Sequence, residues 1–273
     1  MRIHHINCGT MCPVGGRLFD GYSHGLTAHL VCHCLLIETA RGLVLVDTGF
    51  GLRDVHRPRP RLSPFFRALN NIQLREEDTA RRAVERLGFK AEDVRHIVVT
   101  HLDFDHAGGI EDFPNATVHL YARELQAARD ERTGFIARNR YRPRQWDEGV
   151  RWHTYEPGGE PWFGFAAVRD LEGLPPEILL VPLVGHTWGH CGVAVQDAGG
   201  WLLLAGDAYF FHGEMDPARP HCPPGLRAYQ RMMEVDRAAR LANQDRLRDL
   251  VRQHAGAVRV VCSHDKVELE RCG

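Results

Sequence analysis

Short apolar runs alternate with turn residues along the first hundred positions of the chain. Residues 33–38 and 43–47 are two such runs on either side of Gly42, a pattern that predicts a β-hairpin. Over residues 75–87 the apolar positions instead recur every three or four residues, which predicts a helix. The apolar residues 97–99 follow and predict a buried strand.

A second helix and strand are predicted at the end of the chain. Leu247 and Leu250 would lie on the inner face of a long helix that runs from about residue 227 and ends at Gly256. Residues 258–262 then form an apolar run that predicts another strand. Strands and helices in this order are typical of a layered α/β fold with sheets inside and helices outside.

The pattern breaks between residues 129 and 165, which are rich in Trp, Tyr, Arg and Pro and show no strand period. Long irregular segments of a compact domain are commonly lids or binding loops, and the aromatic content argues against disorder. Because no low-complexity linker divides the chain, we predict a single domain over residues 1–273, with 129–165 as an aromatic-rich insertion or lid. Together with Phe65 and Phe66, this segment would form an apolar wall for a substrate or a contact in a homodimer.

The composition narrows the classes of partner. Hydrophobic residues make up 44% of the chain, and 34 basic residues nearly balance 35 acidic ones, so no global field favours nucleic acid. No apolar run approaches the ~20 residues that a membrane helix needs, and the N-terminus lacks the apolar stretch of a signal peptide. We therefore predict a cytoplasmic protein that acts on a small molecule, with its eight cysteines reduced and unpaired.

Candidate chemistry concentrates directly after the predicted strand at 97–99. His101, Asp103, Asp105 and His106 are four potential metal ligands within six residues, and a pair of glycines follows them. His101 and Asp103 are two residues apart, so their side chains point the same way on an extended backbone. Imidazole and carboxylate groups at this density suit Zn²⁺, Mn²⁺ or Fe²⁺.

Three further apolar runs end in a potential ligand, and these ligands are His186, Asp207 and His264. The strands of one sheet deliver their last residues to one edge, so we expect these three side chains to meet the cluster at 101–106. A single histidine at a strand end is commonly a packed or solvent-facing residue. Four strand ends that each carry a His or an Asp are difficult to explain by packing.

The residues resemble the motif of the metallo-β-lactamase superfamily, which is H-x-H-x-D-H followed by a His, an Asp and a final His. The resemblance covers nearly the whole chain, from Asp47-Thr48-Gly49 to His264. It implies an α/β fold of the αββα sandwich type, in which two mixed sheets pack face to face with helices outside. It also implies two divalent metal ions at the edge of the sandwich, with zinc as the first expectation.

The resemblance divides the ligands into two groups. Metal one would be bound by His101, Asp103 and His186. Metal two would be bound by Asp105, His106 and His264. Asp207 would bridge the two ions, and Asp47 would orient one of the ligands through a hydrogen bond.

One position departs from the family motif, because Asp103 stands where the family has its second histidine. A carboxylate is a harder ligand than an imidazole, so the first site would also admit Mn²⁺ or Fe²⁺. Asp is also shorter than His. If it falls short of the metal, the first site binds weakly and a one-metal enzyme results.

The resemblance implies a metal-dependent hydrolase in which a metal-bound hydroxide attacks an ester-type bond. Asp105 would accept the proton of the water and pass it to the leaving group, and Tyr209 would hydrogen-bond the developing oxyanion. The sequence at 207–209, Asp-Ala-Tyr, is similar to the acyl-homoserine lactonase branch, although the tyrosine of that branch typically sits one residue later. A lactone is therefore the expected substrate.

Two alternatives remain open. A glyoxalase II-like thioesterase would use the same hydroxide on a thioester, but no basic cluster for glutathione is evident. A non-catalytic metal-binding or sensing module is the alternative from another class, and Asp103 is the feature that favours it. Among the other histidines, His190 is interpreted as a structural residue behind the ligands, and His212 and His221 as facing solvent.

Overall fold

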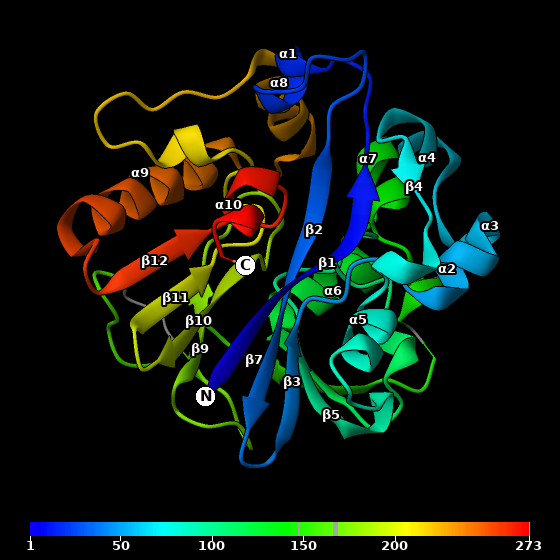
Figure 1. Cartoon of the computed structure of the whole chain (residues 1–273), viewed down its shortest axis with the longest axis vertical. Coiled ribbons are helices and arrows are strands. Elements are labelled where there is room, and N and C mark those ends of the chain that lie inside the picture. The colour runs from blue at the N-terminus through cyan, green and yellow to red at the C-terminus, as the bar shows by residue number, and fades with distance from the viewer. Residues whose placement is uncertain (147, 166–168, 273) are drawn as a thin grey trace.

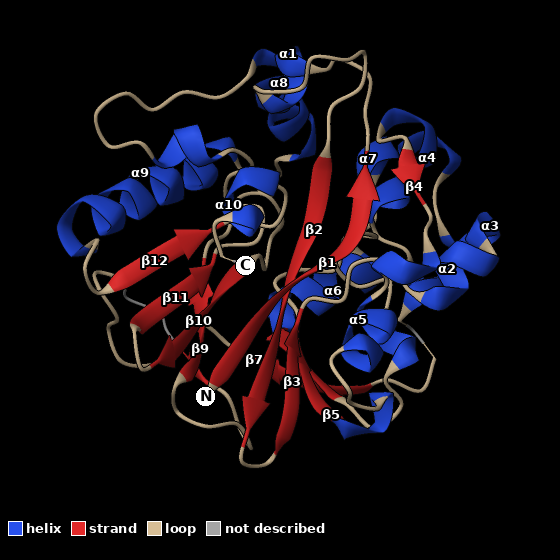
Figure 2. Ribbon diagram, in the orientation of Figure 1, coloured by secondary structure: helices blue, strands red, loops and turns tan. Residues whose placement is uncertain are grey.

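The computed structural model describes residues 1–146, 148–165 and 169–272. Within these residues, two β-sheets pack face to face in the middle of the molecule, and helices cover both outer faces (Figure 1). Figure 2 shows α9 (Arg237–His254) beside the smaller sheet and α5 (Ala80–Arg86) on the side of the larger one. The predicted αββα sandwich of the α/β class is therefore confirmed.

In the described part of the chain, the larger sheet has seven strands in the order β4-β1-β2-β3-β5-β6-β7. They are β1 (Arg2–Met11), β2 (Leu30–Thr39), β3 (Gly42–Val46), β4 (Ile72–Gln73), β5 (Val94–Val98), β6 (Thr117–Tyr121) and β7 (Arg151–Tyr155). The strands from β3 through β5 and β6 to β7 are parallel, whereas β1, β2 and β4 pair antiparallel. The predicted hairpin is β2 with β3, and Gly42 adopts a φ of 118° at its turn.

The smaller sheet has five strands among the described residues, in the order β12-β11-β10-β9-β8. They are β8 (Arg169–Asp170), β9 (Ile178–Pro182), β10 (Cys191–Asp197), β11 (Gly200–Leu204) and β12 (Val258–Val261). Only the pair β11 and β12 is parallel among these described strands. The apolar runs that lead to His186, Asp207 and His264 are β9, β11 and β12, as the sequence predicts.

The remaining helices connect the strands and cover the sheets. They are α1 (Arg17–Asp20), α2 (Leu52–His56), α3 (Pro58–Arg61), α4 (Pro64–Leu69), α6 (Ala122–Asp130), α7 (Gly134–Arg140), α8 (Pro224–Met233) and α10 (Lys266–Glu270). Short 3₁₀ turns lie at Glu76–Asp78, Ala91–Asp93, Ile110–Asp112, Pro143–Gln145 and His212–Met215. Across the described ranges, no helix is both long and apolar enough to cross a membrane.

Apolar side chains fill the space between the two sheets. Leu35 and Ile37 of β2 point into this layer, whereas Leu36 between them packs toward the helices. Val193 and Val195 of β10 meet them from the smaller sheet. Because side chains alternate along a strand, each sheet can pack on its partner and on its covering helices at the same time. The resulting rigid sandwich holds the strand ends in fixed positions.

The helix predicted over 75–87 is shorter than expected. Residues 76–78 form a 3₁₀ turn, and α5 begins only after Thr79. The hydroxyl oxygen of Thr79 accepts a hydrogen bond from the backbone N–H of Arg82, which caps the helix. Apolar spacing alone did not reveal this cap.

The single long helix predicted from about residue 227 is wrong, because the chain forms α8 and α9 with a break between them. Asp236 caps α9 by accepting a hydrogen bond from the backbone N–H of Ala239 at 3.0 Å. The backbone N–H groups of Val235 and Asp236 both donate to the carbonyl oxygen of Gly185. The break therefore fastens α9 to the residue that precedes His186.

Residues 129–165 show no strand period in the sequence, yet they contain β7, which pairs in parallel with β6 over five residues. β7 lies at the edge of the larger sheet, so it needs less apolar alternation than a central strand. The same segment contains α7, whose last residue, Arg140, is buried. Part of this segment therefore belongs to the sandwich itself.

Candidate metal centre

The predicted ligands meet at one edge of the sandwich. The loop from His101 to His106 follows β5 of the larger sheet, while the other three ligands follow β9, β11 and β12 of the smaller one. Each of the seven residues is at most 5% exposed: His101, Asp103, Asp105, His106, His186, Asp207 and His264. The structure thus brings together, between the ends of both sheets, the whole set that the sequence predicts.

Four of these side chains form what we call the His106 group: Asp105, His106, His264 and, through its Oδ1 atom, Asp207. The Nε2 atoms of His106 and His264 are 3.3 Å apart. Asp207 Oδ1 lies 3.4 Å from the first and 3.2 Å from the second. Asp105 Oδ2 is 3.7 Å from His264 Nε2. Ligands about 2.1 Å from one tetrahedral metal ion stand about 3.4 Å apart, so these spacings fit a metal centre.

The hydrogen bonds at the other ring nitrogens support this fit. His106 Nδ1 donates to Asp47 Oδ2 at 2.8 Å, and His264 Nδ1 donates to the carbonyl oxygen of Val31 at 2.8 Å. Both Nε2 atoms can then present a lone pair toward the carboxylate of Asp207. Lone pairs and a carboxylate oxygen that converge in this way repel one another unless they share a cation. The group is therefore built to hold a divalent metal ion.

Asp47 holds the His106 group in place from behind, as the resemblance implied. Its carboxylate accepts hydrogen bonds from the backbone N–H and the hydroxyl of Thr100, both at 2.8 Å, and from His106. Asp47 has a φ of 57°, a conformation that residues other than glycine rarely adopt. Such local strain persists where surrounding contacts enforce it, which is common at functional sites.

The other side chains form what we call the His101 group: His101, Asp103, His186 and, through its Oδ2 atom, Asp207. Asp103 Oδ2 lies 3.4 Å from His101 Nε2 and 3.0 Å from His186 Nε2. Asp207 Oδ2 lies 3.7 Å from the first of these nitrogens and 3.4 Å from the second. His101 Nε2 is buried and has no hydrogen-bond partner among the residues that the structure describes. By ligand spacing alone, this group also fits a metal.

A residue that sequence reasoning missed lies against the His101 group. Arg140, at the end of α7, is 1% exposed and forms a two-pronged ion pair with Asp103, with both N···O distances at 2.6 Å. Its Nη2 atom also donates to His186 Nε2 at 2.6 Å. One signal could have pointed to it: a carboxylate added to a buried ligand set needs a cationic partner. The Arg-rich stretch that begins at residue 129 was the nearest place in the sequence to look for this cationic partner.

Two further buried residues position the ligand loops. The Glu124 carboxylate accepts hydrogen bonds from the backbone N–H groups of Leu102 and Gly189, both at 3.0 Å, and so joins the two loops. His190 donates from Nδ1 to the carbonyl of Leu183, while its Nε2 accepts from the backbone N–H of Asp207. Both nitrogens of His190 are therefore occupied, in agreement with its interpretation as a structural residue.

Charge interactions within the cluster are strong because water is excluded. Burial pushes the pKa of His106 down, but the Asp207 and Asp47 carboxylates outweigh it and leave that pKa well above its usual value. Burial likewise opposes ionisation of Asp207, yet His264 and His106 hold its pKa well below the usual range. Burial raises the pKa of Asp105 to about 6. In the metal-free cluster, the Asp105 carboxylate is therefore more easily protonated than that of Asp207.

A small cavity opens onto both groups. Its lining combines Asp103, Asp105, His186, Asp207 and His264 with six other residues, namely Met11, Leu30, Asn70, Phe210, Tyr229 and Met233. Asn70 Nδ2 donates to the Tyr229 hydroxyl oxygen at 3.2 Å, which leaves the hydroxyl proton available to another acceptor. Burial and the nearby Asp105 carboxylate keep the pKa of Tyr229 well above its usual value, so the hydroxyl remains a donor.

The structure does not bring Tyr209 to this cavity. Its hydroxyl donates to the Glu268 carboxylate at 2.9 Å, and the ring is fully buried. Tyr229 lines the cavity instead, and its place in α8 gave no sequence signal because α8 was not separated from α9. His221 is exposed, as predicted, whereas His212 is partly buried and bonded to Asp265 at 2.7 Å.

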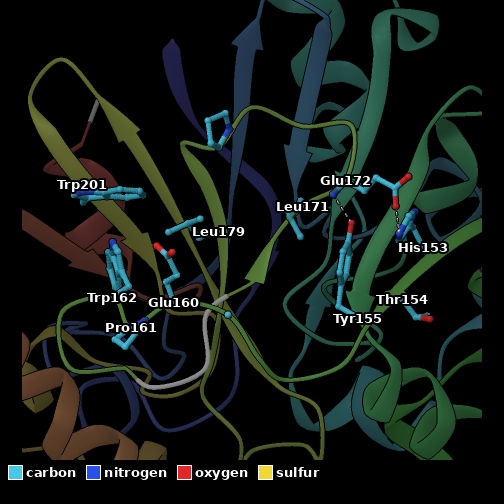
Figure 3. A pocket seen from close by; sticks show the side chains of 12 residues that line it. His153, Thr154, Tyr155, Glu160, Pro161, Trp162, Leu171, Glu172, Leu179 and Trp201 are labelled. Atoms are coloured by element: carbon cyan, nitrogen blue, oxygen red, sulfur yellow. Dashed lines mark hydrogen bonds and ion pairs between the residues drawn. The ribbon is translucent and has the colours of Figure 1, made fainter.

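A second and more open pocket lies away from the ligands (Figure 3). Figure 3 shows Trp162 and Trp201 on one side of it and His153, Tyr155 and Glu172 on the other. Glu172 takes part in two contacts there, with His153 through its carboxylate and with Tyr155 through its backbone N–H. None of the metal-ligand candidates lines this pocket in the described part of the chain, so it is not the place of the predicted chemistry.

Comparison with known proteins agrees with the geometry. The sequence is 42% identical to a probable metallo-hydrolase of Mycobacterium tuberculosis over 97% of this chain and 80% of that protein. It is 33% identical to an N-acyl homoserine lactonase of Bacillus thuringiensis over 77% of this chain and 78% of that protein.

The fold is similar to that of a solved N-acyl homoserine lactone hydrolase, which contains the product N-hexanoyl-L-homoserine at its catalytic metal centre. The TM-score is 0.73 at 22% identity, over 99% of this chain and 96% of that chain. Residues 28–264 match the profile of the metallo-beta-lactamase superfamily. On this match and on its divalent-metal ligand set, the chain belongs to the metallo-beta-lactamase superfamily and is a metal-dependent hydrolase.

Proposed function

We propose that this hydrolase opens the ring ester of a lactone that carries an apolar acyl chain, with zinc as the bound metal. The observation that carries the proposal is the cavity over the ligand groups. Met11, Leu30, Phe210 and Met233 give it an apolar wall, while the Tyr229 hydroxyl and the ligand carboxylates supply polar groups beside it. Relatives at 27–33% identity carry the name N-acyl homoserine lactonase, which supports the same substrate class.

The side chains of the cavity suit hydrolysis of an ester. When bound, the metal supplies a Lewis acid and lowers the pKa of water. Asp105 lines the cavity, so its carboxylate would accept a proton from the attacking water and return it to the leaving alcohol. Tyr229 takes the role that the sequence had suggested for Tyr209, because its hydroxyl can donate to the oxygen on which charge develops.

The same cavity favours a lactone over the glutathione thioester considered above. Glutathione carries two carboxylates, which cationic side chains bind through charge-assisted hydrogen bonds. Neither Lys nor Arg appears among the described residues that line the cavity. An acyl lactone has no negative charge, so it requires no cationic partner beside the apolar residues of the lining.

The test is hydrolysis followed with a pH indicator, using protein loaded separately with Zn²⁺, Mn²⁺ and Fe²⁺. The substrates would be acyl-homoserine lactones of several chain lengths, unsubstituted lactones and a glutathione thioester. We expect the acyl lactones to be turned over best. Asp207→Ala should lose the metal and at least a hundredfold of the activity together, because it removes a ligand from both groups.

Asp197→Ala is a matched control, because Asp197 ends β10 far along the strand from the ligands. It should keep both metal and activity. Preference for the thioester would replace the proposed substrate class with the thioesterase alternative. Bound metal without turnover of any substrate would favour the non-catalytic metal-binding module instead.

A further inference from the structure

Arg140 is held in one position by all of its N–H donors. The Nε and Nη2 atoms bind the two carboxylate oxygens of Asp103, and Nη2 also binds His186 Nε2. Nη1 donates to the backbone carbonyl oxygens of His186, at 3.1 Å, and Met233, at 2.6 Å. A guanidinium group has five N–H donors, and five acceptors surround this one. These hydrogen bonds therefore fix the position of the Arg140 side chain.

The atoms that Arg140 contacts are the ones a metal would need. A guanidinium can only donate hydrogen bonds, so a neutral His186 with its proton on Nδ1 directs the Nε2 lone pair at Arg140 Nη2, whereas a proton on Nε2 would be donated to Asp103 Oδ2 at 3.0 Å. The same lone pair would have to bind the metal, and it cannot serve both. Asp103 likewise gives both of its oxygens to the guanidinium in a fork-shaped pairing.

The charges of Asp103 and Arg140 also argue against a metal at the His101 group. Asp103 adds a negative charge to the His101 group, and by itself it would attract a cation there. Both oxygens of the Asp103 carboxylate lie 2.6 Å from nitrogen atoms of the Arg140 guanidinium, and both residues are at most 2% exposed. The pair therefore stays ionised and cancels its own charge. What remains for a metal at the His101 group is His101 and one oxygen of the shared Asp207.

The His106 group has no such competitor. Among the described residues, no Arg or Lys forms a hydrogen bond or ion pair with its ligand atoms, and the Nε2 atoms of His106 and His264 lie 3.4 Å and 3.2 Å from Asp207 Oδ1. Both Nδ1 atoms are anchored by acceptors behind the rings. This group is therefore fully formed for an ion, while the His101 group is closed by a guanidinium.

We propose that Arg140 takes the place of one of the two metal ions of the family, so that this chain binds one divalent ion, at the His106 group. The inference rests on the proposed function only in that both use the same ligand cluster. Asp103 then acts as the counter-ion of Arg140, which gives a physical reason for the carboxylate in the family's second histidine position. Arg140 is a positioning residue, since it does not line the cavity.

The test is the number of metal ions per chain, measured by elemental mass spectrometry after loading with excess Zn²⁺ and gel filtration. Wild-type protein should hold about one equivalent. The double variant Asp103→His with Arg140→Met restores the family motif and removes the competing cation, so it should hold about two. Arg138→Gln changes an exposed arginine on the same helix and should stay at one. Circular dichroism of each variant would check that it has folded.

Two equivalents in the wild-type protein would overturn the inference, and so would one equivalent in a folded double variant. The wild-type measurement needs no substitution, so misfolding of a variant cannot conceal the answer. Metal count and lactone turnover are separate measurements. Two equivalents with lactone turnover would leave the proposed function standing, whereas one equivalent without turnover would leave only the inference about Arg140.

Discussion

Two tyrosines near the ligands differ in the direction of their hydroxyl groups. Tyr229 lines the cavity, whereas Tyr209 is bonded to Glu268. We expect Tyr229→Phe to lower kcat for an acyl lactone about a hundredfold with little change in KM, because the donor acts on charge that develops in the transition state. Tyr209→Phe should change kcat less than twofold and lower the free energy of unfolding by about 1 kcal/mol. Steady-state kinetics and thermal melts of both variants would measure this, and the reverse pattern of kcat would restore the role first predicted for Tyr209.

The ligands could be predicted from the sequence because each follows an apolar strand directly. His186, Asp207 and His264 are local features of a strand end, and parallel or neighbouring strands bring such ends together. Arg140 is different, because it lies 37 residues from Asp103 and is separated from it by a 3₁₀ turn, β6 and α6. Only the folded chain shows that this arginine, among several nearby, is the buried one.

At the scale of elements, the link between α9 and the strand end before His186 can be tested. Gly185 has a φ of 134°, and a Cβ atom there would lie 2.4 Å from the backbone nitrogen of Arg240. Gly185→Ala should therefore displace α9 or the ligand loop, and we expect weaker zinc binding by at least tenfold together with a lower melting temperature. Asp236→Ala removes only the cap of α9, so it should cost about 1 kcal/mol of stability and leave zinc affinity unchanged.

Zinc affinity would be measured by competition with a chelating dye, and stability by thermal melts of the metal-free proteins. If Gly185→Ala bound zinc as tightly as the wild type, the contact with α9 would have no part in placing His186. If Asp236→Ala lost as much zinc affinity as Gly185→Ala, then α9 itself, and not the glycine, would hold the ligand loop.

The same elements show where sequence patterns fail. The hairpin of β2 and β3 was predictable because both strands are apolar and a glycine turn separates them. The break between α8 and α9 was not, since helical spacing continues through it and the carbonyl of Gly185 that stabilises it is distant in sequence. β7 was missed because it is polar on one side, as an edge strand can be. In each case a contact from another part of the chain decided the outcome.

At the scale of the whole molecule, the metal ligands come from both sheets. The loop after β5 belongs to the larger sheet, whereas His186, Asp207 and His264 follow strands of the smaller one. An ion bound at the proposed His106 group would therefore join the two halves of the sandwich across their apolar interface. Metal binding and stability of the fold are coupled for this reason.

This coupling predicts a melting temperature that depends on metal and on pH. At pH 8, zinc at about a hundred times its dissociation constant should raise the melting temperature by roughly 5–10 °C over chelator-treated protein. His106 and His264 both have raised pKa values without metal, because nearby carboxylates outweigh burial. Zinc must displace the protons that these rings hold, so its apparent affinity should fall as the pH falls, about tenfold per pH unit for each proton displaced. Thermal melts with and without zinc at pH 6 and pH 8 would measure the effect. If zinc raised the melting temperature equally at both pH values, it would not bind through these histidines.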